Sequence, residues 1–237
     1  MATLRPTILV VEDEPDIRRF LNASLDVEGY RVVESATGRR GTIDAGTHKP
    51  DLAIVDLALP DMDGIEVIRR IRGWSPMPII VLSARIHEKS KIDALDAGAN
   101  DYVTKPFAIG ELLARIRAAL RYALRGDSGS TLLRLGNAEI DLGRRVAQRD
   151  GQPIHFTPIE FRLLASLARN SGMVTTHRQL LTEVWGPTHA ADTHYLRIYM
   201  KQLRVKLEPD PVQPRHLMTE TGIGYRLVTA KDEDPAS

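Results

Sequence analysis

The sequence predicts two domains, the first an open, doubly wound parallel sheet and the second a smaller α+β unit. Three observations lead to this prediction. The length of 237 residues exceeds that of a typical single domain. Short apolar runs alternate with helical patterns through the first half, which is typical of a parallel sheet flanked by helices. After a segment rich in glycine and serine at residues 125–131, the pattern changes to short antiparallel strands and three helices.

The first half contains five strand–helix units. Strands are expected where apolar residues run without alternation, because strands buried on both faces have no polar side; these runs are Ile8–Val11, Val32–Val33, Leu52–Val55, Ile79–Leu82 and Tyr102–Val103. Helical patterns follow each of them, at Pro15–Glu28, Gly38–Ala45, Ile65–Ile71, Lys89–Ala97 and Ile109–Leu124. The short repeats favour right-handed crossovers and a five-stranded, doubly wound sheet.

The second half begins with short strands over Leu132–Phe156, with turns at Leu142-Gly143 and Asp150-Gly151. Thr157 begins a helix that ends near Asn170, because Pro158 suits the first helical position and Glu160 completes a capping box. Two further helices and a terminal β-hairpin complete this unit, and they are expected at His177–Trp185, His194–Leu207 and Thr219–Val228, the hairpin having Gly222 and Gly224 at its tip.

These elements define the expected domain boundaries. The first domain covers residues 1–124, residues 125–131 form a linker, residues 132–230 form the second domain, and residues 231–237 form a disordered tail.

Composition restricts the classes of protein that fit. The chain contains no cysteine, which excludes disulfides and cysteine-ligated metal sites. No run of about 18 apolar residues occurs and the N-terminus does not resemble a signal peptide, so we expect a cytoplasmic protein without a membrane partner. The net charge of +1 conceals an asymmetry, because residues 130–231 carry 14 basic and nine acidic side chains. Modest positive charge in the second half is compatible with nucleic acid and also with an ordinary solvated surface.

Polar side chains stand where the apolar strands of the first half end. With the flavodoxin-like strand order 2-1-3-4-5, the first and third strands are neighbours, so Glu12, Asp13 and Asp56 converge at the carboxyl edge where such sheets bind ligands. Three crowded carboxylates favour a cation, and a site with oxygen ligands alone favours Mg²⁺. Ser83 and Lys105 end the fourth and fifth strands and can hold phosphoryl oxygens. Together these residues suit phosphorylation of a carboxylate.

Each of these residues alone has a simpler explanation. Glu12 or Asp13 could cap a helix, Ser83 could be a loop hydroxyl, and Lys105-Pro106 could form an ordinary turn. Their coincidence at four strand ends favours the phosphoryl site.

The first half resembles the receiver domain of two-component response regulators. The resemblance covers residues 7–122 and rests on the motifs VVEDEP, VDLALPDMDG, IIVLSA, DAGANDYVTKPF and GELLARIRAALR. It implies that Asp56 is the phosphoacceptor and that Glu12, Asp13, Asp56 and the backbone carbonyl of Ala58 hold Mg²⁺. It further implies that Ser83 is a switch hydroxyl, Tyr102 a switch aromatic, and Lys105 the phosphate-pairing lysine, aimed by a cis peptide to Pro106.

The helix expected at His194–Leu207 has two faces. Its narrow apolar face carries Leu196, Met200, Leu203 and Leu207 at helical spacing. The opposite face combines exposed apolar residues with basic and amide ones, namely His194, Ile198, Lys201, Gln202 and Val205. An amphipathic surface helix is the simpler explanation. A helix that reads the major groove would carry such residues, because amides and lysine bond base edges and apolar groups contact thymine methyls.

The second half resembles the winged-helix effector domain of the OmpR/PhoB subfamily of response regulators over residues 132–228. The segments FTPIEFRLL, RQLLTEVWG, THYLRIYMKQLRVKLE and TETGIGYRL carry this resemblance. It implies that residues 194–207 form the recognition helix, that Arg204 contacts a DNA phosphate, and that Arg226 enters the minor groove from the wing. The loop Gly186–Thr193 is implied to meet RNA polymerase.

The resemblance also implies specific partners. Residues GWSPMPIIVLSAR, HYLRIYMKQLR and PRHLMTETGIGYR are similar to those of regulators of potassium-transport operons, which implies a KdpD-like sensor histidine kinase as phosphodonor and double-stranded operator half-sites as targets. Phosphorylated receivers of this subfamily form homodimers through charged pairs, and these positions correspond to Lys91 with Glu111 and Asp101 with Arg115. Asn100 replaces an acid of that face, so a weaker dimer is expected.

Three alternatives remain beside a transcription regulator of potassium transport. The chain could be a regulator of the same subfamily with a different regulon. A Mg²⁺-dependent phosphatase of the same fold would need a carboxylate two residues beyond Asp56, where Ala58 stands. An adaptor whose second domain binds protein is the third alternative. We expect a regulator that assists its own phosphorylation and dephosphorylation and is otherwise not an enzyme.

Overall fold

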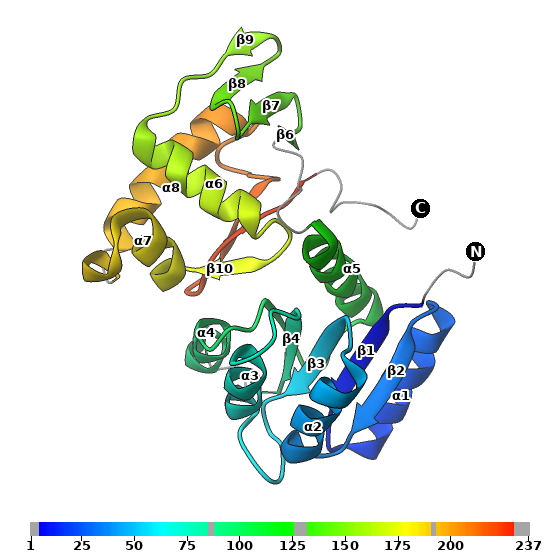
Figure 1. Cartoon of the computed structure of the whole chain (residues 1–237). Coiled ribbons are helices and arrows are strands. Elements are labelled where there is room, and N and C mark those ends of the chain that lie inside the picture. Colours follow the sequence, from blue (N-terminus) through cyan, green and yellow to red (C-terminus); the bar gives the residue numbers. More distant parts are fainter. Residues whose placement is uncertain (1–4, 85–87, 126–131, 191–192, 230–237) are drawn as a thin grey trace. The chain divides into compact units, whose positions relative to one another are not determined.

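The apolar runs of the first half form the strands of one parallel sheet. The computed structural model describes residues 5–84, 88–125, 132–190 and 193–229, and the chain divides into two compact units, Met1–Leu124 and Arg125–Ser237 (Figure 1). In the first unit the strand order is β2-β1-β3-β4-β5, and its strands are β1 (Thr7–Val11), β2 (Arg31–Ser35), β3 (Leu52–Asp56), β4 (Ile79–Ser83) and β5 (Asp101–Thr104). The predicted fold class and strand order are confirmed.

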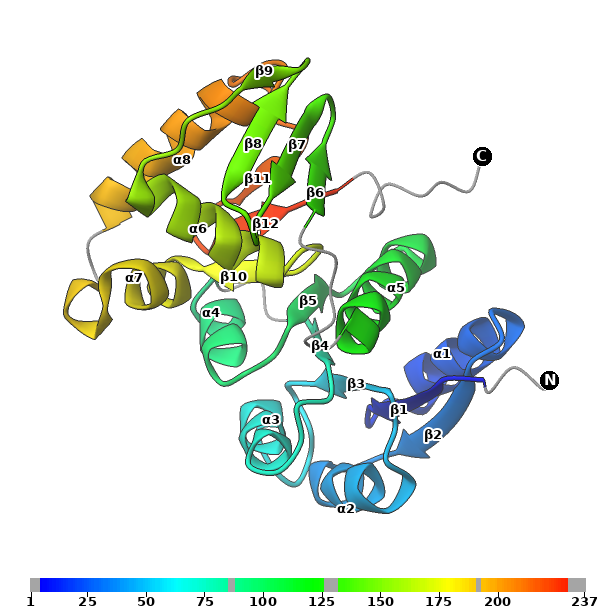
Figure 2. The ribbon, with the colours of Figure 1, turned by 45° about the horizontal axis from the view of Figure 1, so that its top comes forward.

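Helices cover both faces of this sheet (Figure 2). They are α1 (Pro15–Val27), α2 (Gly38–His48), α3 (Gly64–Arg72), α4 (Glu88–Asp96) and α5 (Ile109–Arg125). On one face Leu21 and Leu25 of α1 and Ile116 of α5 share a buried core with alternate strand residues such as Val10 and Ile54. The other three helices, α2, α3 and α4, lie on the opposite face. Burial on both faces explains why the strands lack polar alternation.

The strands extend slightly beyond the apolar runs. Parallel pairing continues to Asp56, which lies beside Leu82, and to Ser83, which lies beside Thr104. The backbone of a polar residue can continue the ladder of hydrogen bonds, so the end of the apolar run does not end the strand. As a result, Asp56 and Ser83 are held by the sheet itself.

In its described residues, the second unit contains two antiparallel sheets and three α-helices. A four-stranded sheet comes first, made of β6 (Leu132–Leu135), β7 (Ala138–Asp141), β8 (Val146–Arg149) and β9 (Gln152–Pro153). The helices α6 (Pro158–Arg169), α7 (His177–Trp185) and α8 (Thr193–Leu207) follow, with a 3₁₀ turn at Pro187–His189. Thr157 and Glu160 form the predicted capping box. One core contains Leu163, Leu181 and Leu203 from the three helices.

The hairpin belongs to a sheet with a strand that the sequence pattern did not reveal. Strands β11 (Leu217–Glu220) and β12 (Gly224–Leu227) form the hairpin, and β10 (Val174–Thr176) pairs with β12. Gly224 was expected at the tip but lies inside β12, where an added Cβ would stand 2.0 Å from the carbonyl oxygen of Thr175. The close approach of two strands explains the glycine at this position.

Some expectations lie outside the described residues. Residues 126–131 of the predicted linker and the predicted tail 231–237 are among them, as are residues 191–192 of the loop before α8. Arg125, the first residue of the predicted linker, is the last residue of α5. Within the described residues, no helix is long and apolar enough to cross a membrane.

Candidate functional sites

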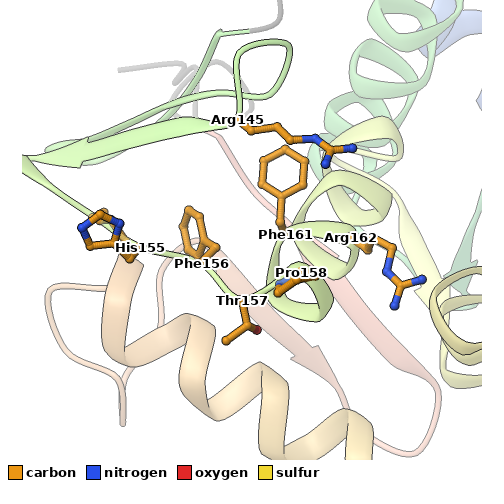
Figure 3. Close-up of a pocket in the computed structure, with 8 residues that line it drawn as sticks. Arg145, His155, Phe156, Thr157, Pro158, Phe161 and Arg162 are labelled. Atoms are coloured by element: carbon orange, nitrogen blue, oxygen red, sulfur yellow. The ribbon is translucent and has the colours of Figure 1, made fainter.

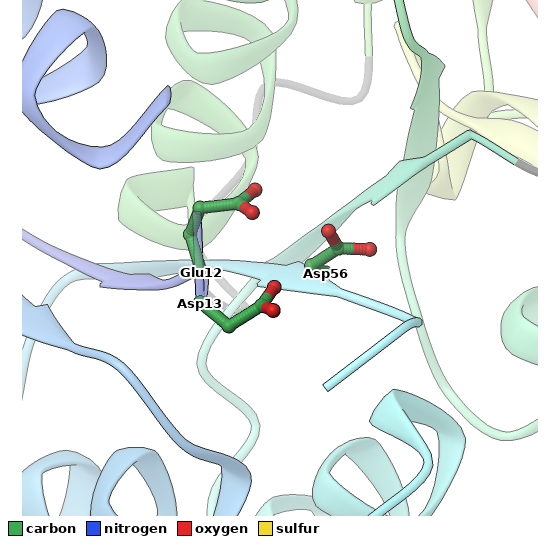
Figure 4. Close-up of side chains that lie close together, drawn as sticks. All are labelled: Glu12, Asp13 and Asp56. Carbon is green, nitrogen blue, oxygen red and sulfur yellow. The ribbon is translucent and has the colours of Figure 1, made fainter. Parts of the chain in front are cut away.

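Three carboxylates meet at the carboxyl edge of the first sheet. Glu12 and Asp13 follow β1, and Asp56 ends β3, so the pairing of these two strands brings them together. One oxygen of each can be chosen so that the three lie within 4.8 Å of one another, and Figure 4 shows the side chains turned toward a common space. Glu12 is completely buried, Asp56 is 3% exposed, and Asp13 is half-buried. The predicted convergence of these residues is therefore observed.

Lys105 pairs with two of these carboxylates. Its Nζ lies 2.6 Å from Oδ2 of Asp56 and 2.7 Å from Oε2 of Glu12, and the peptide bond between Lys105 and Pro106 is cis, as the family resemblance implied. Oε1 of Glu14 lies farther away, at 3.6 Å. One ammonium group against three clustered carboxylates leaves surplus negative charge at this edge of the sheet.

Burial and charge shift the titration of this cluster. Burial raises the pKa of Glu12 to about 7, with Asp56 adding to the rise and Lys105 opposing it. Burial acts to lower the pKa of Lys105, but hydrogen bonds and charge contacts with Asp56 and Glu12 outweigh it and raise this pKa. The lysine is therefore charged at neutral pH, whereas ionised Glu12 is disfavoured until further positive charge is present.

The loop after Asp56 is held close to its carboxylate. The backbone N–H of Ala58 donates a 3.0 Å hydrogen bond to Oδ1 of Asp56, and Ala58 forms an isolated antiparallel bridge with Asp63. An added Cβ at Gly64 would lie 2.2 Å from the carbonyl oxygen of Asp56, so only glycine permits this approach. The backbone carbonyl of Ala58, which is a predicted Mg²⁺ ligand, therefore lies in a constrained loop.

The donor set of this cluster fits magnesium. Carboxylate and carbonyl oxygens are the ligands that Mg²⁺ accepts, and the ion keeps several waters when only a few protein ligands are available. The surplus charge and the disfavoured ionisation of Glu12 are both relieved by a nearby cation. Glu12, Asp13 and Asp56 would hold it. The carbonyl of Ala58 remains a predicted fourth ligand.

Two predicted switch residues lie near this edge. Ser83 ends β4, is 1% exposed, and accepts a 2.9 Å hydrogen bond at its carbonyl from the N–H of Lys105. Tyr102 on β5 is 9% exposed, and the ammonium of Lys91 lies 4.6 Å from the centre of its ring. Tyr102, the predicted aromatic switch, therefore occupies a buried position in this structure and makes a cation–π contact with Lys91.

The exposed face of α8 has the predicted composition. Ile198 is 41% exposed and Val205 is 57% exposed, although both are aliphatic, while His194, Lys201 and Gln202 are exposed beside them. The opposite side, Leu196, Met200, Leu203 and Leu207, is buried in the core.

Two further residues of α8 belong to this surface, and the sequence analysis missed them. Tyr195 is 56% exposed and Arg197 is also exposed. At 100° per residue, Tyr195 falls beside Ile198 and Gln202, so the helical periodicity contained a signal for it. An aromatic ring and a guanidinium extend the set of groups that can contact bases and phosphates.

Arg226 does not have the predicted exposure. It lies on β12, is 8% exposed, and donates hydrogen bonds to the carbonyl oxygen of Gly172 at 2.6 Å and to Oε1 of Glu220 at 2.8 Å. The tip of the hairpin is formed by residues 221–223 instead. The minor-groove contact therefore remains a prediction, and the observed role of the guanidinium is to join the hairpin to the loop after α6.

Arg204 is also engaged within the unit. Its guanidinium donates twice to the carbonyl oxygen of Leu217, at 2.6 and 3.0 Å, and once to Oγ1 of Thr219 at 2.7 Å. The side chain is half-buried between α8 and β11. Its predicted phosphate contact remains a prediction, and its observed role is to hold the hairpin against the helix.

A hollow of about 340 Å³ separates α8 from the hairpin. Its lining has three arginine or lysine side chains from α8 and no carboxylate, and it consists of His177, Arg197, Met200, Lys201, Arg204, Pro211, Thr219, Thr221, Gly222 and Tyr225. Positive charge here suits an anion such as a nucleic-acid phosphate.

A second hollow of the same unit, about 310 Å³, lies at the start of α6 (Figure 3). Phe156, Phe161, Arg145 and Arg162 are among its lining residues, and the Arg145 guanidinium lies 5.4 Å from the centre of the Phe161 ring. None of the residues predicted to contact DNA lines it, so the candidate DNA surface is the one at α8.

Three of the charges predicted to pair between subunits, Asp101, Arg115 and Glu111, are paired within the chain. Asp101 is 1% exposed and accepts a 2.8 Å hydrogen bond from Arg115, which also binds Glu111 at 2.7 Å. Oδ1 of Asn100 accepts hydrogen bonds from Arg72 and from the N–H of Ile79. Asp101 and Arg115 therefore form an intrachain contact in this structure, and Asn100 is directed at Arg72. The pairing of Asp101 with Arg115 between subunits remains a prediction.

Comparisons with known proteins identify the family. Residues 8–117 match the response regulator receiver domain, and residues 151–227 match the C-terminal domain of transcriptional regulatory proteins. The KDP operon transcriptional regulatory protein KdpE of Escherichia coli K12 is 56% identical over 221 residues, which cover 93% of this chain and 98% of that protein. The chain belongs to the response regulators.

Other relatives place this response regulator in the OmpR/PhoB group. Transcriptional regulatory protein KdpE of Mycobacterium tuberculosis H37Rv is 48% identical and covers 93% of this chain and 98% of its own length. The crystal structure of DrrB, an OmpR/PhoB homologue from Thermotoga maritima, matches with a TM-score of 0.50 and 31% identity, covering 95% of this chain and all of that one. The response regulator is thus a two-component, DNA-binding transcription regulator, and the predicted subfamily is confirmed.

Proposed function

We propose that this response regulator accepts a phosphoryl group on Asp56 from a sensor histidine kinase and that this modification activates its binding to operator DNA. The main support is the geometry of Asp56, a buried carboxylate whose Oδ2 lies 2.6 Å from Nζ of Lys105 and whose neighbours are two further carboxylates. A carboxylate oxygen of Asp56 forms the new bond to phosphorus while the bond from phosphorus to the donor's histidine nitrogen breaks, and the imidazole keeps the electron pair.

The residues around Asp56 have distinct proposed roles. Mg²⁺ held by Glu12, Asp13, Asp56 and the Ala58 carbonyl would neutralise charge on the phosphoryl oxygens. Lys105 moves its hydrogen bond from Asp56 to a phosphoryl oxygen, and the Ser83 hydroxyl turns to another. Tyr102 responds to this movement as the aromatic switch, in contact with Lys91. The chain assists its own phosphorylation and dephosphorylation, and its role is regulation.

The similarity to KdpE proteins supports the regulon. We propose that the target is a potassium-transport operon and that a KdpD-like histidine kinase is the phosphodonor, because identity to the Escherichia coli regulator reaches 56% across both domains. The phosphorylated form is proposed to pair as a homodimer on adjacent half-sites and to meet RNA polymerase through residues 186–193, in the cytoplasm.

Labelling with acetyl phosphate tests the phosphoacceptor. We expect Mg²⁺-dependent labelling of the wild type, no labelling of Asp56→Asn, and normal labelling of Asp16→Asn, which removes an exposed carboxylate from α1. Undiminished labelling of Asp56→Asn, or labelling of the wild type in the presence of EDTA, would refute the assignment.

A further inference from the structure

The loop between β3 and α3, residues 57–63, is attached to a helix far away in the sequence. Oδ1 of Asp61 accepts a 2.8 Å hydrogen bond from the N–H of Gly38, and Oδ2 accepts a 2.9 Å bond from the N–H of Arg39. These are the first two N–H groups of α2, which have no acceptor within the helix. The bond from Arg39 is the main cause of a lowered pKa of Asp61, so the carboxylate is ionised at neutral pH.

The neighbouring residue packs against the same helix end. An added Cβ at Gly38 would lie 2.5 Å from Cγ of Met62, so the loop and the start of α2 are in direct contact. At the other end of the loop, Asp63 caps α3 by accepting the N–H of Ile65 at 2.9 Å. Ala58 bridges to Asp63 across the loop. The segment that carries Ala58 is therefore held by β3, by α3 and, at its middle, by α2 through Asp61.

We propose that Asp61 is a positioning residue for the phosphoacceptor site. By fixing the loop to α2, it holds the Ala58 carbonyl in the place where Mg²⁺ needs an oxygen ligand beside Asp56. Asp61 itself contacts the backbone of α2 and belongs to neither the carboxylate cluster nor its lysine. The inference rests on the proposed function, because it assigns a role toward the same magnesium and phosphoryl site.

Helix capping alone is the competing explanation, and the chain contains a matched control for it. Oγ1 of Thr37 also accepts an N–H of the first turn of α2, that of Arg40, at 3.2 Å. Thr37→Ala removes a cap from the same helix end but leaves the loop attached. If Asp61 only stabilises α2, the two variants should behave alike toward Mg²⁺.

Calorimetric titration of the full chain with Mg²⁺ distinguishes these explanations. We expect Asp61→Ala, which removes both hydrogen bonds to α2, to weaken Mg²⁺ binding about five-fold, which corresponds to about 1 kcal/mol. Asp61→Asn keeps one acceptor oxygen and should recover part of the loss, while Thr37→Ala should stay within about two-fold of the wild type although it removes a comparable cap.

Labelling with acetyl phosphate provides a second readout. Asp61→Ala should require more Mg²⁺ for half-maximal labelling but reach the wild-type rate at saturating Mg²⁺, because Asp56 and Lys105 are retained. Wild-type affinity in Asp61→Ala, or an equal loss in Thr37→Ala, would overturn the inference and leave the proposed function intact. Failure of the wild type to bind Mg²⁺ or to be labelled would instead refute the proposed function.

Discussion

Glu160 shows at the residue scale how a buried charge is held in the DNA-binding unit. Its side chain accepts hydrogen bonds from the N–H of Thr157 at 2.6 Å and from Lys206 at 2.7 Å, and the residue is 1% exposed. Burial acts to raise the pKa of Glu160, but the bonds from Lys206 and Thr157 outweigh it and lower this pKa. The lowered pKa means that ionised Glu160 stabilises the folded state.

This stabilisation has a defined pH range. It is present above the unfolded pKa of 4.5 and is lost as the pH falls through the lower folded value. We expect Glu160→Gln to lower the free energy of unfolding by about 2 kcal/mol at pH 7, because a buried charge pair loses one partner. The difference in unfolding free energy between this variant and the wild type should narrow as the pH falls below 4.5, as measured by thermal unfolding followed by circular dichroism.

Glu139→Gln is the matched control, because Glu139 pairs with the exposed Arg134. It should change the unfolding free energy by less than about 0.5 kcal/mol. A gap between Glu160→Gln and the wild type that persists unchanged at pH 3 would contradict the proposed charge stabilisation.

At the scale of elements, close approaches between strands depend on single glycines. Gly224 allows β12 to pack against β10, whereas Gly46 lies on the exposed side of α2 with no heavy atom within 4 Å of an added Cβ. The same substitution should therefore have opposite effects at the two positions.

We expect Gly224→Ala to lower the free energy of unfolding by more than about 2 kcal/mol, because the added methyl group would force the two strands apart. Gly46→Ala should raise it by about 0.5–1 kcal/mol, as alanine is favoured inside helices. Chemical denaturation of both variants measures this, and a neutral Gly224→Ala would show that the strands can separate without cost.

The predicted recognition helix α8 should read bases through the exposed amide of Gln202. Gln202→Ala should reduce discrimination between operator and random DNA by about 1–3 kcal/mol, since a bidentate base contact would be lost. Arg162→Ala is the control, because Arg162 is exposed on α6 and is not among the residues predicted to contact DNA. Competition binding at fixed salt measures both variants. An equal loss on both kinds of DNA from Gln202→Ala would exclude base reading by this residue.

At the scale of the whole molecule, the excess of positive charge lies in the second unit. The 14 basic and nine acidic side chains of residues 130–231 give the DNA-binding unit its positive charge. A receiver dimer would bring two such units to adjacent half-sites and raise affinity through effective concentration. Regulation would then depend on pairing of the receivers.

The predicted pairing can be tested by charge reversal at Lys91 and Glu111. Each such pair contributes about 0–1 kcal/mol, so Glu111→Lys should weaken a beryllofluoride-induced dimer by bringing like charges together. The double variant Lys91→Glu/Glu111→Lys should restore it, since both pairs then have opposite signs. Sedimentation velocity at tens of micromolar measures the dimer.

Two outcomes would exclude the face that carries Lys91 and Glu111 as the dimer interface. One is a beryllofluoride-treated wild type that remains monomeric, and the other is a double variant no better than Glu111→Lys. Because Glu111 is also bonded to Arg115 within the chain, the recovery of the dimer in the double variant, and not the loss in Glu111→Lys alone, identifies the pairing between subunits.

The sequence alone determined the receiver sheet, the carboxylate cluster and the exposed face of α8. Each follows from a pattern that depends on neighbouring residues: an unbroken apolar run such as Leu52–Val55, a polar residue at the end of a strand such as Asp56, or a helical repeat such as Leu196–Leu207. The capping box of Thr157 and Glu160 is local in the same way. Burial of an apolar stripe requires such patterns, so they can be recognised from the sequence alone.

Only the tertiary structure decided which charged side chains form contacts within the chain. Arg226 is bonded to Gly172, Arg115 to Asp101, and Asp61 to the N-terminus of α2, and these partners lie 54, 14 and 22–23 residues away. A charged side chain can turn to solvent or to any hydrogen-bond partner within its reach, so its sequence neighbours do not determine its contacts. The folded backbone determines which acceptors lie within that reach, and for these residues it selected partners inside the chain.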